Sequence, residues 1–126
     1  MRDNDPQAAS AARPATVAGP VPTEQMIALI GAGPSGLAGA RCLQKLGIPF
    51  QGFEAYSDVG GLWNIANPRS TVYESAHLIS SKRTTEFSEF PMPEGTADYP
   101  SHRELCRYFS DFADHFDLRR HYRFST

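Results

Sequence analysis

The stretch IGAGPSGLAGARCLQKLGIPFQGFEA, residues 30–55, decides the fold of this chain. Its three glycines, Gly31, Gly33 and Gly36, have the spacing G-x-G-x-x-G and directly follow the apolar run MIALI. A short, continuous apolar run that ends at a glycine is typical of a strand buried on both faces of a parallel sheet. We therefore expect residues 26–30 to form a central strand.

A helix and a second strand are expected after the glycines. Proline suits the first turn of a helix and glycine the position just past its end, so Pro34 and Gly47 predict where the helix opens and closes. One helical face is expected to lie on the sheet, namely Ala38, Cys42, Leu43 and Leu46. Residues 50–53 predict a strand that ends at Glu54. This order predicts an α/β fold, a partial doubly wound domain of the Rossmann type.

The chain after residue 55 divides into an irregular stretch, a helix and a strand. Turn signals fill the irregular stretch to residue 100, with short strands expected at 61–64 and 71–79. Ser101 and Glu104 form the S-x-x-E capping box at the start of a helix over 101–116. An apolar stripe at helical spacing should pack in the core, namely Leu105, Tyr108, Phe109, Phe112 and Phe116. Residues 121–126 alternate like a strand, with Tyr122 and Phe124 on one face.

The composition excludes several classes of protein. The 126 residues carry a formal net charge of -2, without the basic patch of a nucleic-acid-binding protein. No run approaches the roughly 18 consecutive apolar residues that a membrane helix needs. Residues 1–24, rich in Ala and Pro, predict a disordered tail before a domain over 25–126. Cys42 and Cys106 suggest free thiols in the cytoplasm, and neither they nor the four histidines have the spacing of metal ligands.

Each glycine of the loop has a separate task in a dinucleotide-binding fold. Gly31 allows the tight turn, Gly33 lets the backbone approach a pyrophosphate, and Gly36 lets the helix pack close to the strand. Backbone N–H groups at the helix start then favour the phosphate charge. Glu54, at the end of the second strand, can accept hydrogen bonds from both hydroxyls of an adenosine ribose. Its carboxylate would repel a 2′-phosphate, which leaves NAD and FAD as candidates for this loop.

A second glycine pair, Gly60 and Gly61, favours FAD over NAD. NAD binding requires no such pair, whereas FAD continues from its diphosphate through ribityl to a flavin ring. The pair would let the chain run close to the diphosphate and ribityl, and Leu62 and Trp63 would cover the flavin. An ordinary turn with a core tryptophan is the structural alternative.

From about residue 26 to 126 the chain resembles the flavin-containing monooxygenases. The segments that carry the resemblance are GAGPSGLAGARCL, FEAYSDVGGLWN, STVYESAHLISSK, EFSEFPMP and YPSHRELCRYFSDFADHFDLRRHYRFST. Their order and spacing look like those of the family's N-terminal FAD-binding segment. Related Baeyer–Villiger enzymes share the glycine loop and a similar GG-x-W, but VYESAHLISSK and FPMP look more like the flavin-containing monooxygenases.

The resemblance implies a reaction and a set of cofactor contacts. NADPH, whose site would lie mostly outside this chain, reduces FAD, and a flavin hydroperoxide then oxygenates a small substrate at nitrogen or sulfur. The implied diphosphate contacts are Gly31, Ala32, Gly33, Pro34, Ser35 and Gly36. The remaining implied contacts are Glu54 on the FAD ribose, Gly61, Leu62 and Trp63 toward the flavin, and Leu78, Ile79 and Ser80 near the flavin and nicotinamide. The resemblance assigns no catalytic residue.

Two departures from the family pattern qualify this expectation. Family members commonly carry asparagine where this chain has Ile79. Either His77 or bound NADP supplies the missing contact, or the hydroperoxide is less protected and the enzyme would release hydrogen peroxide as an oxidase. A second G-x-G-x-x-G and the F-x-G-x-x-x-H motif are absent from the sequence. We therefore expect an N-terminal fragment of a larger flavoenzyme that lacks turnover alone. The alternatives are a fragment of a NAD-dependent dehydrogenase and a non-catalytic module derived from a flavoprotein.

Overall fold

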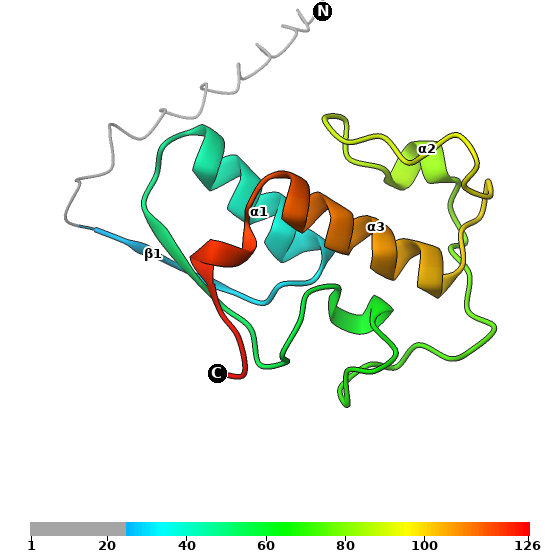
Figure 1. Ribbon diagram of the computed structural model, residues 1–126, viewed down its shortest axis with the longest axis horizontal. Helices are drawn as coiled ribbons and strands as arrows, with labels where there is room; N and C mark the ends of the chain where they lie inside the picture. Colours follow the sequence, from blue (N-terminus) through cyan, green and yellow to red (C-terminus); the bar gives the residue numbers. More distant parts are fainter. Residues whose placement is uncertain (1–24) are drawn as a thin grey trace, which may run out of the picture.

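The computed structural model describes residues 25–126, so the tail predicted for 1–24 lies outside the described residues (Figure 1). The three strands are β1 (Ile27–Ile30), β2 (Phe50–Phe53) and β3 (Tyr122–Arg123). The three α-helices are α1 (Pro34–Lys45), α2 (Lys82–Thr85) and α3 (His102–His115). Two short 3-10 helices complete the set, η1 (Gly61–Trp63) and η2 (Arg119–His121). No helix within this part of the chain is long and apolar enough to cross a membrane.

The three strands form one parallel sheet in the order β1-β2-β3. The predicted strand–helix–strand unit is confirmed, and the last strand lies beside the second as in a doubly wound sheet. The strand predicted over 121–126 is shorter in the structure, because Ser125 has a φ of +55°, outside the extended region. The burial predicted for both faces of β1 is wrong within this chain. β1 lies at the edge, and Ile30 is 77% exposed on the face opposite the one that carries Leu29.

The face of α1 that packs inward matches the predicted one in part: Leu43 packs against the core as predicted. Leu37 and Ala40 are buried, whereas Cys42 is exposed and Leu46 is 71% exposed. Gly36 packs against the Gly31 backbone, and a side chain at Gly39 would contact Leu29 of β1. The prediction was based on the apolar side chains of the helix. The closest approach to the strand is instead at Gly36 and Gly39, which have no side chain, and these two glycines determine which face of α1 meets the sheet.

Helix α3 supplies most of the core, as its apolar stripe predicted. Its capping box is present, with the Glu104 side chain accepting from the Ser101 backbone N–H at 2.9 Å. Leu105, Tyr108 and Phe109 are at most 4% exposed. α1 and α3 lie next to one another in Figure 1, and their buried residues form one cluster with Phe50 and Tyr122 of the sheet. The aromatic stripe is therefore core packing.

The two strands predicted in the irregular stretch are wrong. Residues 61–63 form η1, because Gly60 and Gly61 have φ values of +106° and +57° that an extended strand does not adopt. Residues 71–79 make only one bridge, between His77 and Ser101. The neighbouring residue is Pro100, which has no N–H to extend the ladder.

Candidate functional site

The fold requires glycine at two of the three glycine positions in the loop between β1 and α1. Gly31 has a φ of +96°, which favours glycine. A Cβ on Gly36 would overlap the Gly31 carbonyl oxygen and lie 2.8 Å from its carbon. Gly33 has an ordinary backbone conformation, with φ -75° and ψ -177°, and its added Cβ would approach nothing closer than the Gly61 Cα at 3.6 Å. The fold thus explains two glycines and leaves Gly33 for an external reason, such as a ligand.

The N-terminus of α1 is open to an anion. Gly33 is its N-cap residue, no side chain caps it, Pro34 stands in the first turn, and that turn contains no acidic residue. Helix α3 in the same chain shows the contrast, since its own Ser101 and Glu104 satisfy the first-turn donors. Unsatisfied N–H groups and the helix dipole together favour a phosphate at this end of α1. Ser35, in the first turn, is exposed.

Glu54 is buried directly beside the loop. One carboxylate oxygen accepts from the Ala32 N–H at 2.6 Å, and the other accepts from the Tyr56 N–H at 2.8 Å. A carboxylate has about four acceptor sites, so two sites remain for the hydroxyls of a ribose. The Ala32 N–H is already bonded within the protein, and its carbonyl accepts from Gly60 N at 3.0 Å. Ala32 therefore shapes the loop, and its predicted contact with the diphosphate stays a prediction.

The second glycine pair packs directly on the loop. A Cβ on Gly61 would lie 2.9 Å from the Gly33 Cα, closer than real Cβ atoms come to other atoms. Gly60 has a φ of +106°. The sequence predicts a ligand role or an ordinary turn for this pair, whereas the structure shows that its backbone also packs against that of Gly33. The pair and the loop therefore pack together through glycine backbones.

The segments predicted to lie beside the flavin meet around one open cavity of about 380 Å³. Leu62 and Trp63 line one part of it and Leu78 and Ile79 another, although they come from segments well apart in the sequence. Ile79 is 97% exposed. The other lining residues are Thr71, Val72, Tyr73, Ala76 and His77. Ser80 does not line this cavity, and its hydroxyl lies 3.0 Å from that of Thr85.

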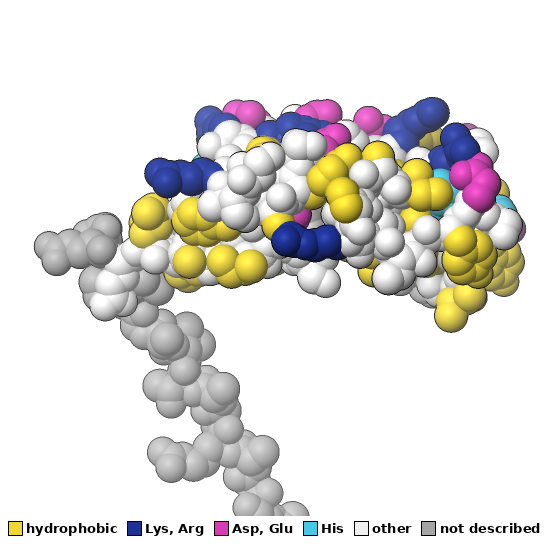
Figure 2. Space-filling view, turned by 90° about the horizontal axis from the view of Figure 1, so that it is seen from below, with side chains coloured by type: hydrophobic (Ala, Val, Ile, Leu, Met, Phe, Trp, Pro, Cys, Tyr) yellow, Lys and Arg dark blue, Asp and Glu magenta, His cyan; other side chains and the backbone are white. Residues whose placement is uncertain are grey.

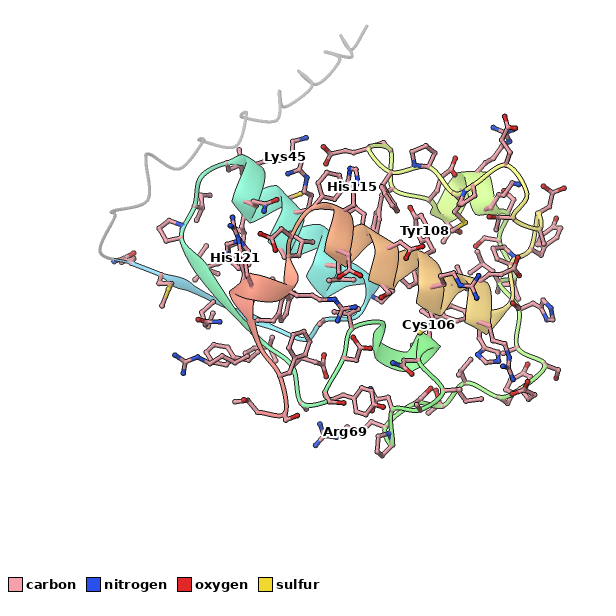
Figure 3. The ribbon with its side chains drawn as sticks, in the orientation of Figure 1. Lys45, Arg69, Cys106, Tyr108, His115 and His121 are labelled. Atoms are coloured by element: carbon pink, nitrogen blue, oxygen red, sulfur yellow. The ribbon has the colours of Figure 1, made fainter. Side chains whose placement is uncertain are left out.

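A smaller cavity of about 210 Å³ follows Glu54 and was not predicted. Ala55 and Tyr56 line it together with Asn67, Pro68 and Arg69, which is labelled in Figure 3. Asn67 is buried and accepts from the Arg69 N–H at 3.0 Å. Because the cavity adjoins the ribose-binding candidate, it is placed where an adenine could lie. In the sequence, residues 67–70 (NPRS) indicate only a turn within the irregular stretch.

Two titratable groups beside the glycines keep their protons: the Tyr122 hydroxyl donates to the Gly31 carbonyl, and the Cys106 sulfur would lie 3.5 Å from a Cβ on Gly60. Burial, and secondarily the charge of Glu54, raises the pKa of Tyr122 to about 12, so its hydroxyl remains a donor. Burial and the nearby Asp58 raise the pKa of the Cys106 thiol, which makes it a poor nucleophile. Cys42 and Cys106 are both free, and residues 25–126 hold no cluster of metal-ligating side chains.

The flavin-binding monooxygenase-like family model matches residues 24–126. The chain belongs to this family. It is 38% identical over 104 residues to dimethylaniline monooxygenase [N-oxide-forming] 2 of Oryctolagus cuniculus, a match that covers 79% of this chain. It is 35% identical over 108 residues to flavin-containing monooxygenase 5 of Homo sapiens, covering 82% of this chain. The matches span only 19% and 20% of these relatives.

Solved structures give the same result. The S-allyl-L-cysteine S-oxygenase of Allium sativum superposes with a TM-score of 0.72 at 27% identity, over 79% of this chain and 27% of that protein. The oxidised steroid monooxygenase bound to NADP gives 0.67 at 29% identity, over 79% and 19%. OTEMO with bound FAD gives 0.68 at 30% identity, over 79% and 18%. The predicted family and the partial doubly wound α/β fold are thus confirmed.

Proposed function

We propose that this chain is the FAD-binding part of an NADPH-dependent monooxygenase that oxygenates small molecules at nitrogen or sulfur. The family membership supports a flavin monooxygenase. The names of two relatives, an N-oxide-forming monooxygenase and an S-oxygenase, support nitrogen and sulfur as the atoms oxidised. The chain spans about a fifth of the curated relatives that it matches, so residues outside it would complete the enzyme.

The observation that carries the proposal is the open N-terminus of α1 beside Gly33 and Glu54. An FAD diphosphate would accept hydrogen bonds from the free first-turn N–H groups, and no Cβ at Gly33 would block its approach. The Glu54 carboxylate would hold the ribose through its two remaining acceptor sites. The glycine pair lies next to this point, where the cofactor would continue toward the larger cavity. The arrangement therefore fits an extended dinucleotide.

The residues around the larger cavity would hold and shield the flavin. When bound, flavin supplies the transfer of electrons to oxygen and of one oxygen atom to the substrate. Leu62, Trp63 and Leu78 would form an apolar wall that excludes water from its ring. Ile79 presents an alkyl group to the same space and has no hydrogen-bonding atom in its side chain.

The NADPH part of the proposal rests on relatives. The steroid monooxygenase has NADP bound, and OTEMO has been seen with FAD and NADP together. Glu54 would repel the 2′-phosphate of NADPH, which argues that NADPH binds elsewhere than in this loop. The residues for that second site would lie mostly outside this chain.

A binding titration tests the proposal. The purified chain should quench the fluorescence of FAD. ADP should compete with FAD for the chain, since both ligands carry the diphosphate. Preference for NAD over FAD would favour the dehydrogenase alternative. A folded chain that binds neither would contradict the proposal and favour a non-catalytic module.

A further inference from the structure

One peptide group of the glycine loop is held at both ends. The Tyr122 hydroxyl donates to the Gly31 carbonyl oxygen at 3.2 Å. The N–H of the same peptide group, that of Ala32, donates to the Glu54 carboxylate at 2.6 Å. Carbonyl and N–H point in opposite directions in a trans peptide, so the two bonds act from opposite sides. Together they fix the orientation of the peptide plane.

The position of Tyr122 is built into the sheet. Tyr122 lies on β3 and pairs with Gly52 on β2. A Cβ on Gly52 would lie 2.5 Å from the tyrosine ring, and a Cβ on Gly36 would lie 3.4 Å from its hydroxyl oxygen. The ring is thus enclosed between two glycines and is only 7% exposed. It can reach the Gly31 carbonyl because both positions lack a side chain.

Besides its packing against Gly36, this peptide group is restrained by hydrogen bonds. Gly31 has no Cβ and a φ of +96°, so its own sterics restrict the peptide weakly. Among the described residues, Tyr122 is the one hydrogen-bond donor to its carbonyl oxygen. A rotation of this peptide would shift Gly33 and the first turn of α1, which follow directly. The direction of the free N–H groups therefore depends on it.

We propose that Tyr122 is a positioning residue for the diphosphate-binding loop, acting through the Gly31–Ala32 peptide. The role rests on the proposed function, since it assumes that this loop binds FAD. Tyr122 touches no cofactor in this role. It aligns the N–H groups before the cofactor arrives, so binding costs less ordering.

The Tyr122→Phe variant tests the role, with Tyr108→Phe as its matched control. Both substitutions remove one buried hydroxyl and keep the ring. Tyr108, labelled on α3 in Figure 3, donates to the Phe90 carbonyl at 2.6 Å and accepts from the Phe87 N–H at 2.7 Å, away from the glycine loop. We expect Tyr122→Phe to weaken FAD binding about three- to tenfold, the effect of one hydrogen bond. Tyr108→Phe should leave the Kd for FAD unchanged while it lowers the Tm.

Hydrogen exchange at the Ala32 amide separates positioning from general stability. Without FAD, exchange should accelerate in Tyr122→Phe and remain unchanged in Tyr108→Phe. Equal FAD affinity in Tyr122→Phe and the unsubstituted chain would overturn this inference and leave the proposed function standing. No FAD binding by the unsubstituted chain would instead overturn both. Failure of Tyr122→Phe to fold, with Tyr108→Phe folded, would also overturn the inference, because the hydroxyl would then serve the fold and not the binding loop alone.

Discussion

Replacing Gly33 and Gly36 by alanine separates the cofactor from the fold. At Gly33 the new methyl group meets nothing closer than 3.6 Å, and the backbone conformation suits alanine. Alanine is a poorer N-cap than glycine but restricts the unfolded chain, so the net change in unfolding free energy should stay within about 1 kcal/mol. At Gly36 the methyl group would overlap the Gly31 backbone, which cannot move away without separating α1 from β1. Overpacking of this kind costs about 3 kcal/mol or more.

The effect on FAD affinity should follow the opposite order, with the direct loss of binding at Gly33 and not at Gly36. A methyl group at Gly33 would keep the diphosphate from the first-turn N–H groups of α1. Loss of two hydrogen bonds to a charged group costs about 3 kcal/mol, or roughly a hundredfold in Kd. Gly36→Ala should bind poorly only to the extent that it is unfolded.

Two measurements on each variant decide the matter. Thermal unfolding without FAD should show a Tm within about 8 °C of the unsubstituted chain for Gly33→Ala, and a far larger decrease for Gly36→Ala. Fluorescence titration with FAD then gives the Kd of the folded protein. Gly95→Ala is the matched control, because its new methyl group would meet nothing within 4 Å. Unchanged FAD affinity in Gly33→Ala, or its failure to fold, would refute the reasoning.

Three further predictions concern α3 and the larger cavity. Ser101→Ala should lower the unfolding free energy by about 1 kcal/mol, read as a Tm decrease of about 4–8 °C, because the capping box is lost. Hydrogen bonds from the backbone and side chain of Ser101 lower the pKa of Glu104 below its usual 4.5. The Glu104 carboxylate therefore contributes to the stability of the fold above pH 4.5, and this contribution is lost as the pH falls through the lowered pKa. The Tm advantage over Glu104→Gln should therefore shrink as the pH falls below about 4.5. In a complete enzyme, Ile79→Asn should raise the ratio of oxygenated product to hydrogen peroxide, and an unchanged ratio would contradict the idea that an amide is missing there.

Exposed apolar residues mark the edge of the sheet in this chain. Met26, Ile27 and Ile30 are at least 36% exposed, and Figure 2 shows apolar side chains at the surface in several places of the face seen there. An unpaired strand edge favours association with another strand. The buried environment that the apolar run MIALI predicts is thus absent for β1 within residues 25–126.

The sequence by itself determined the features that depend on near neighbours. The strand–loop–helix–strand unit follows from an apolar run, glycine spacing and Pro34, all within about thirty residues. The capping box at Ser101 needs only two residues three positions apart. The same local patterns carried the family resemblance, and with it the choice of FAD. The position of Glu54 beside the loop could be predicted because it stands at the end of a recognisable strand, and its contact with a ribose stays a prediction.

Only the tertiary structure decided which groups hold the loop in shape. The contact between Gly33 and Gly61 joins two turns whose φ values cannot be read from composition. Tyr122 reaches Gly31 across 91 positions, through a space left by Gly52. The packed face of α1 was predicted only in part: Leu43 packs against the core, but Cys42 and Leu46 are exposed, because close backbone approach at Gly36 and Gly39 sets the orientation of the helix. Such contacts depend on where strands and helices pack in space, and a linear pattern of residue types does not contain that information.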